Sequence, residues 1–231
     1  MIVNNIDVTI IRKNIKNAHL YVKPPYGNVE VTCPENYSDE NVRLFVITKL
    51  SWIKRQQESF QGQLRQSERE YVSGETVFLF GKQYYLQVDY SSKGYKIIVD
   101  GNKIKFIVRQ DSTVKQREKQ FNEWFREKFN ECLKTLVPKC ESKTGIKSNG
   151  YKIINMKSKW GSCTIAKRII NLNLQLVKKD YSSIEYVVIH ELIHLIDSTH
   201  GPKFLNLMNG FIPNWKEIRD NLNSQTLENF R

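Results

Sequence analysis

The sequence predicts an α+β protein with a β-rich amino-terminal region, residues 1–110, and a second region, residues 111–231, of helices and a small sheet. Short alternating runs separated by turn residues are typical of strands, and they dominate the first 110 residues. Helical patterns near 113–142 and 184–196 dominate the rest. The second pattern is apolar on nearly every side, which places that helix inside a core.

In the first region, residues 6–34 alternate like strands, with a turn at 24–28. Ser38 is the expected N-cap of a long helix, whose tail at 55–70 is rich in Gln and charge and is expected to be solvated. Two hairpins follow. The first joins 77–80 to 84–88, and the second joins 97–99 to 104–108.

In the second region, the helix at 113–142 carries an aromatic stripe that indicates a core face, and Pro138 is expected to kink or end it. Residues 151–156 and 168–174 predict strands of a small sheet beside the apolar helix. Ser182 and Glu185 form a capping-box pattern at the start of that helix. Helices near 202–210 and 214–223 complete the region.

The polar residues in the middle of the apolar helix are His190, Glu191 and His194, which form the pattern H-E-x-x-H. Positions i and i+4 share one helix face, so two imidazoles can bind one ion at a Zn–N distance of about 2.0–2.1 Å. Glu191 leans toward the same face, where it can accept a proton from water held by the ion. His200 follows a turn and completes a three-histidine site with one position open to water.

This pattern predicts one zinc ion per chain and metal-assisted hydrolysis of an amide bond. The competing interpretation is a metal-free helix whose histidines bond to neighbouring groups. It is disfavoured because burying two imidazoles and a carboxylate without a metal costs free energy.

Four segments resemble the YgjP-like family of predicted zinc metallopeptidases. They read KWGSC at 159–163, INLN at 170–173, YVVIHELIH at 186–194 and HGPKF at 200–204. The resemblance is strongest over about residues 150–220. It implies a zincin-like catalytic domain at 111–231, with zinc held by His190, His194 and His200 and with Glu191 as the base.

The expected substrate is a peptide or a protein. In zincins the edge strand of the small sheet commonly pairs with an extended peptide. Asn171 and Asn173 mark the candidate strand and are candidate substrate-binding residues. The alternative is an ordinary exposed strand with polar side chains.

The net charge of +12 favours acidic partners, including nucleic acid, although the sequence contains no nucleic-acid-binding motif. A solvated, lysine-rich surface is the favoured explanation of the charge. Two other functions stay open. One is a protease resembling the SprT-like enzymes that act on DNA-bound proteins, and the other is a non-catalytic, metal-stabilised binding module.

Three further features of the sequence predict where in the cell the protein resides. No run of about 18 apolar residues occurs, so no membrane span is expected. The first residues lack the basic-then-apolar pattern of a secretion signal. The four cysteines show no paired metal-binding spacing, and reduced thiols in a cytoplasmic protein are the simplest interpretation.

Overall fold

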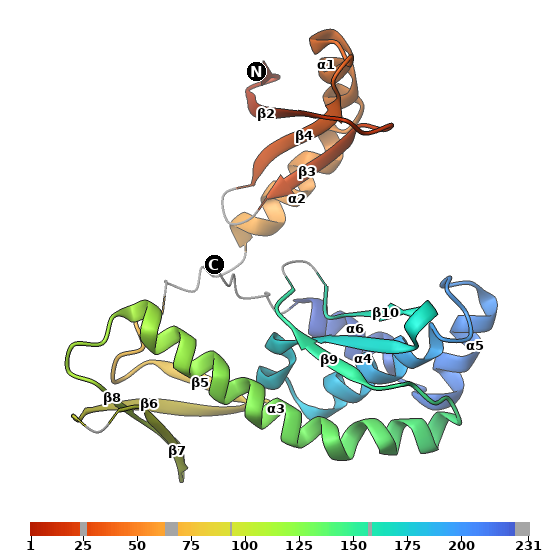
Figure 1. Cartoon of the computed structure of the whole chain (residues 1–231). Helices are drawn as coiled ribbons and strands as arrows, with labels where there is room; N and C mark the ends of the chain where they lie inside the picture. Colours follow the sequence, from red (N-terminus) through yellow and green to blue (C-terminus); the bar gives the residue numbers. More distant parts are fainter. Residues whose placement is uncertain (24–26, 63–68, 93, 157–158, 225–231) are drawn as a thin grey trace. The chain divides into compact units, whose positions relative to one another are not determined.

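The computed structural model describes residues 1–23, 27–62, 69–92, 94–156 and 159–224. Its contacts divide the chain into two compact units, Met1–Ser67 and Glu68–Arg231 (Figure 1). Each unit has its own buried apolar core. Helices and three small sheets occur together in the described part of the chain, which confirms the predicted α+β class.

The first unit combines one four-stranded sheet with two helices. Its strands are β1 (Ile2–Val3), β2 (Ile6–Lys13), β3 (His19–Lys23) and β4 (Asn28–Pro34), in the order β1-β2-β4-β3. The helices are α1 (Asp39–Thr48) and α2 (Leu50–Gly62). The Oγ atom of Ser38 accepts a hydrogen bond from the Asn41 backbone N–H at 3.2 Å, which confirms the predicted cap.

The long helix predicted after Ser38 is two helices, because Lys49 leaves the helical conformation between them. Apolar residues from both helices share a core with the sheet. Most of the turn predicted at 24–28 and residues 63–68 of the predicted solvated tail lie outside the described residues.

The second unit begins with the strands β5 (Thr76–Leu79), β6 (Lys82–Tyr90), β7 (Lys96–Asp100) and β8 (Lys103–Val108). Both predicted hairpins are confirmed, since β5 pairs antiparallel with β6 and β7 pairs antiparallel with β8. The two hairpins join through parallel pairing of β6 and β8, which gives the order β5-β6-β8-β7.

This sheet shares its core with α3 (Val114–Thr144), so the contact boundary falls before β5 rather than at the predicted 110/111. Phe106 of β8 packs edge-on against Phe121 of α3, with 5.3 Å between ring centroids. The alternating strands bury one face against a helix, and that helix lies in the region predicted to be separate.

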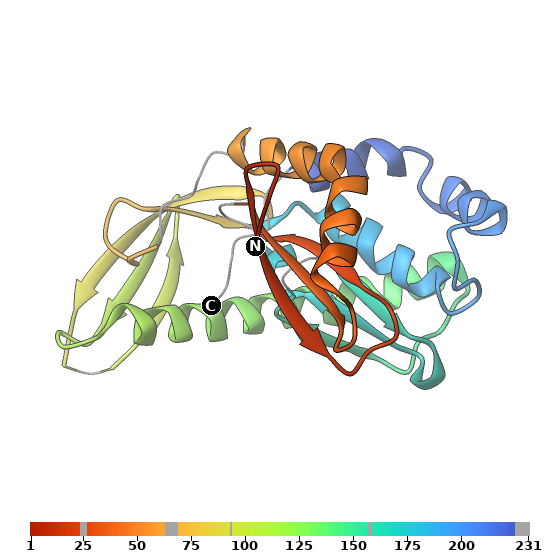
Figure 2. The ribbon, with the colours of Figure 1, turned by 90° about the horizontal axis from the view of Figure 1, so that it is seen from above.

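Helix α3 begins with a capping box at Thr113, continues through Pro138 and ends at Gly145. The φ of +71° at Gly145 is the left-handed conformation that favours glycine at a helix end. Pro138 therefore does not end the helix. In both views α3 extends from the β5–β8 sheet to a smaller sheet (Figures 1 and 2).

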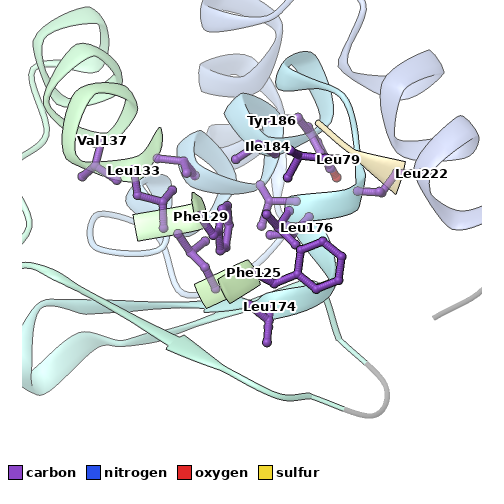
Figure 3. Packing of buried hydrophobic residues seen from close by; sticks show 14 of the residues in the cluster. Leu79, Phe125, Phe129, Leu133, Val137, Leu174, Leu176, Ile184, Tyr186 and Leu222 are labelled. Atoms are coloured by element: carbon purple, nitrogen blue, oxygen red, sulfur yellow. The ribbon is translucent and has the colours of Figure 1, made fainter. Parts of the chain in front are cut away.

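The smaller sheet consists of β9 (Tyr151–Ile154), β10 (Gly161–Thr164) and β11 (Ile169–Asn173), in the order β10-β11-β9. Beside it lie α4 (Tyr181–Ile193), α5 (Pro202–Phe211) and α6 (Trp215–Ser224). Figure 3 shows Leu133 of α3 and Ile184 of α4 in the core that these elements share. No described helix has the length and apolar character needed to cross a membrane.

Candidate metal centre

Helix α4 supplies the first part of the site. Asp180 is its N-cap, and the Asp180 carboxylate accepts a hydrogen bond from the Ser183 backbone N–H at 2.7 Å. The predicted cap at Ser182 is wrong, since the Ser182 hydroxyl donates to Asp180 at 2.8 Å instead. Apolar side chains cover most of α4, so it is buried between α3, α5, α6 and the small sheet. The end of α4 that carries His190 and Glu191 is thereby held in the core.

The three predicted histidines lie together. His190 is on α4, His194 is at its C-cap, and His200 comes from the turn before α5. The Nε2 atom of His190 lies 3.2 Å from Nε2 of His194 and 3.1 Å from Nε2 of His200. One ligand atom from each histidine could therefore hold a metal ion.

Phe204 of α5 orders these rings. Its ring centroid lies 4.9 Å from that of His190, 5.0 Å from that of His194 and 4.6 Å from that of His200. Phe204 is fully buried, so it forms a rigid apolar surface under the imidazoles. The sequence offered no sign of this contact apart from the family resemblance.

Asp197 builds the turn that returns His200 to the site. Its carboxylate accepts hydrogen bonds from the Thr199 backbone N–H at 2.9 Å and the Thr199 hydroxyl at 2.8 Å. Its backbone carbonyl lies 3.0 Å from Nδ1 of His194. A carbonyl can only accept, so Nδ1 carries the proton and the lone pair lies on Nε2, where His190 and His200 converge.

Glu191 lies beside the histidines and is only 5% exposed. Its Oε2 atom and the Nδ1 atom of His190 have no hydrogen-bond partner among the described residues. Burial raises the pKa of Glu191 to about 8, against a lowering effect of Lys159. Burial also lowers the pKa of His190 to about 3, with smaller contributions from the other two histidines. The site thus holds a neutral imidazole next to a carboxyl group that burial makes easier to protonate than an exposed glutamate.

Strand β10 forms the wall opposite α4, and the sequence did not predict it as a strand. Gly161 of β10 approaches Glu191 so closely that a methyl group there would lie 2.7 Å from Oε1. Residues 159–163 line a cavity of about 500 Å³ together with the three histidines and Glu191. The cavity is also lined by Tyr186, Arg219 and Asn223, which sequence patterns did not mark as site residues.

The predicted edge strand at 171–173 is wrong, because β11 is the middle strand of its sheet. Asn173 is fully buried, and its amide group donates to the backbone carbonyls of Met156 at 2.9 Å and Lys159 at 2.7 Å. The amide group of Asn171 donates to Ser162 and Thr164 at 3.3 Å. Both side chains hold β10 and the segment before it.

The model of the YgjP-like metallopeptidase domain matches residues 16–225. The chain belongs to this family. The match spans both compact units, and the family is one of metallopeptidases. No curated protein matches the chain.

Two solved structures are similar over part of the chain. One is the metallopeptidase zymogen of Pyrococcus abyssi abylysin, with 22% identity, coverage of 39% of this chain and 90% of that chain, and a TM-score of 0.37. The other is the metallopeptidase zymogen of Methanocaldococcus jannaschii jannalysin. It has 27% identity, coverage of 39% and 92%, and a TM-score of 0.36.

Proposed function

We propose that this chain is a zinc-dependent peptidase in which Glu191 acts as the general base. His190, His194 and His200 would hold one zinc ion per chain through their Nε2 atoms. The proposal depends on one observation, which is the convergence of these three atoms beside a buried carboxylate. Three protein ligands leave a position for solvent, which is typical of catalytic rather than structural zinc sites.

The donor set fits such an ion. Two Zn–N bonds of about 2.05 Å at a tetrahedral angle separate their nitrogens by about 3.3 Å. The separations of His190 Nε2 from Nε2 of His194 and of His200 are 3.2 and 3.1 Å. The proton on Nδ1 of His194, directed to the Asp197 carbonyl, leaves the correct nitrogen available as a ligand.

When bound, the ion would polarise the scissile carbonyl and lower the pKa of the attacking water. Glu191 would accept the proton of that water and then donate it to the leaving amine nitrogen. The buried setting suits this task, because a carboxyl group with a pKa of about 8 holds a proton far better than an exposed glutamate does.

The geometry supports an extended peptide as substrate. Among the described strands, β10 pairs only with β11 and has its other edge open. A peptide that pairs with this edge would pass Gly161 and bring its carbonyl groups close to Glu191. We therefore assign to β10 the role that the sequence suggested for residues 171–173.

The test compares the wild type with Glu191→Gln on a peptide library derived from whole-cell protein. The variant should keep its zinc, measured by elemental analysis, and lose at least about a hundredfold in turnover. Glu185→Gln is the matched control, because Glu185 lies on the same helix, pairs with Lys143 at 2.9 Å and does not line the cavity. Equal hydrolysis by the wild type and Glu191→Gln would refute the assigned role.

The same cleavage assay distinguishes the proposed function from its two alternatives. A non-catalytic binding module would show no Glu191-dependent cleavage of any peptide. A protease for DNA-bound proteins would cleave a DNA-binding protein faster when DNA is added, and salt would reduce that gain.

A further inference from the structure

One face of α6 (Trp215–Ser224) contributes to the wall of the cavity. Trp215, Arg219 and Asn223 are spaced four residues apart, so they lie along a single side of the helix. Arg219 and Asn223 line the same cavity as His190 and Glu191. The cationic side chain of Arg219 thus belongs to the candidate active site, although it lies far from the three histidines in the sequence.

Aromatic rings hold the guanidinium group of Arg219 in place. Its Cζ atom lies 5.1 Å from the ring centroid of Trp215. That ring stacks parallel to Tyr186, with centroids 6.5 Å apart and 3° between planes. Tyr186 is one helical turn before His190 on α4, so the arginine is tied through two rings to the helix that carries the site.

Hydrogen bonds fix the rest of this wall. Trp215 donates through Nε1 to Asn209 at 2.7 Å, and Trp160 donates through Nε1 to Asn223 at 3.2 Å. Arg219 pairs with the exposed carboxylate of Asp220, at 2.9 Å from Nε and 2.8 Å from Nη2. This ion pair faces solvent, and such pairs exchange readily for a better-placed carboxylate.

The charges of the cavity favour an anion. Two cationic side chains, Lys159 and Arg219, line it, and Glu191 is the one carboxylate among the described lining residues. Glu191 is committed to the proton transfer proposed above. The planar guanidinium group matches a carboxylate with two parallel hydrogen bonds.

We propose that Arg219 is a specificity-determining residue that binds a carboxylate of the peptide substrate close to the scissile bond, with Lys159 adding to the positive potential. This inference rests on the proposed peptidase function. The carboxylate is either an Asp or Glu side chain or the free carboxyl terminus of the peptide. The enzyme would therefore cleave acidic substrates in preference to neutral ones of the same shape.

The test uses matched peptides around a cleavage site found in the library. One pair replaces Glu by Gln at each position flanking the site, and another replaces the free carboxyl terminus by an amide. The pair that carries the preference identifies the source of the carboxylate. The wild type should show a kcat/KM about 10- to 100-fold higher for the acidic member, which is the scale of a hydrogen bond to a charged group.

Substitutions assign that preference to Arg219. Arg219→Gln should remove most of the acid-to-neutral preference in kcat/KM, leaving the small part that Lys159 supplies, and Arg219→Lys should retain more of it. Asp220→Asn should increase the ratio, because the competing carboxylate is removed. Lys216→Gln is the matched control, since Lys216 lies 5.8 Å from the same Trp215 ring but does not line the cavity.

Binding gives a second readout that does not need turnover. The inactive Glu191→Gln variant can be titrated with the acidic and the neutral peptide in a calorimeter. It should bind the acidic peptide more tightly, and adding Arg219→Gln to it should remove most of that preference. Glu191-dependent cleavage with no preference for the acidic peptides would overturn this inference and leave the peptidase intact. A preference that Arg219→Gln leaves unchanged would also overturn it. Absence of any Glu191-dependent cleavage would overturn both proposals.

Discussion

The close approach of β10 to Glu191 makes Gly161→Ala an informative perturbation. The added methyl group would lie 2.7 Å from Oε1, 2.9 Å from Cγ and 3.0 Å from Cδ of Glu191. Ordinary contacts between carbon atoms are about 3.5–4.0 Å, so the carboxylate must move by about 0.5–1 Å. Glu191 is buried, which leaves little room for that movement.

A misplacement of about 1 Å can lower a catalytic rate by about a hundredfold, so Gly161→Ala should reduce kcat by about 10- to 100-fold. The free energy of unfolding should fall by about 1–3 kcal/mol, as is usual when a packed site receives an extra methyl group. The three atoms nearest to the added methyl group all belong to Glu191 and none to a histidine, so zinc content should stay at the wild-type level.

The assay combines peptide hydrolysis, thermal unfolding and elemental analysis. Gly210→Ala is the control, because a methyl group on this residue of α5 meets nothing within 4 Å and should raise stability by about 0.5–1 kcal/mol. Wild-type kcat in Gly161→Ala would refute the argument that β10 positions the general base.

Three further predictions follow from other parts of the second unit. Leu133→Ala should lower the free energy of unfolding by about 2–5 kcal/mol in chemical denaturation, because Leu133 is fully buried in the core of Figure 3; a change below 1 kcal/mol would contradict that packing. Asp180→Ala should cost about 1 kcal/mol as the loss of the α4 cap. Burial opposes ionisation of Asp180, but hydrogen bonds from Ser183 and Ser182, together with the charge of Lys179, outweigh it and lower the pKa of Asp180. The stability from this cap should thus be present above the ordinary pKa of aspartate and be lost as the pH falls through the lowered value; a pH-independent effect would contradict it. His194→Ala should abolish stoichiometric zinc binding in elemental analysis, whereas His19→Ala, on β3 of the first unit, should keep it.

The sequence predicted the parts of the fold that depend on local patterns. The spacing of His190 and His194 placed both on one helix face, and His200 followed from the turn residues before Pro202. The two hairpins of the second unit came from alternation with Gly81 and Gly101 at the turns. In these places the local preference and the tertiary environment agree.

Features set by tertiary packing were not predictable in this way. β10 has no alternating apolar residues. It is a strand because it pairs antiparallel with β11, whose Asn171 and Asn173 side chains also bind β10 and the segment before it. β11 is buried along most of its length as a middle strand, so its polar residues did not indicate exposure. Arg219 lies in the site because α6 packs against α4, and no local sequence pattern reveals that contact.

The proposed function requires that three imidazole nitrogens hold one ion and leave a position open beside Glu191. X-ray absorption of the zinc-loaded protein tests it most directly. We expect one zinc per chain with three imidazole ligands at about 2.0–2.1 Å and no sulfur. A shell with a thiolate at about 2.3 Å, such as Cys163 of the cavity wall, or with four protein donors would contradict it.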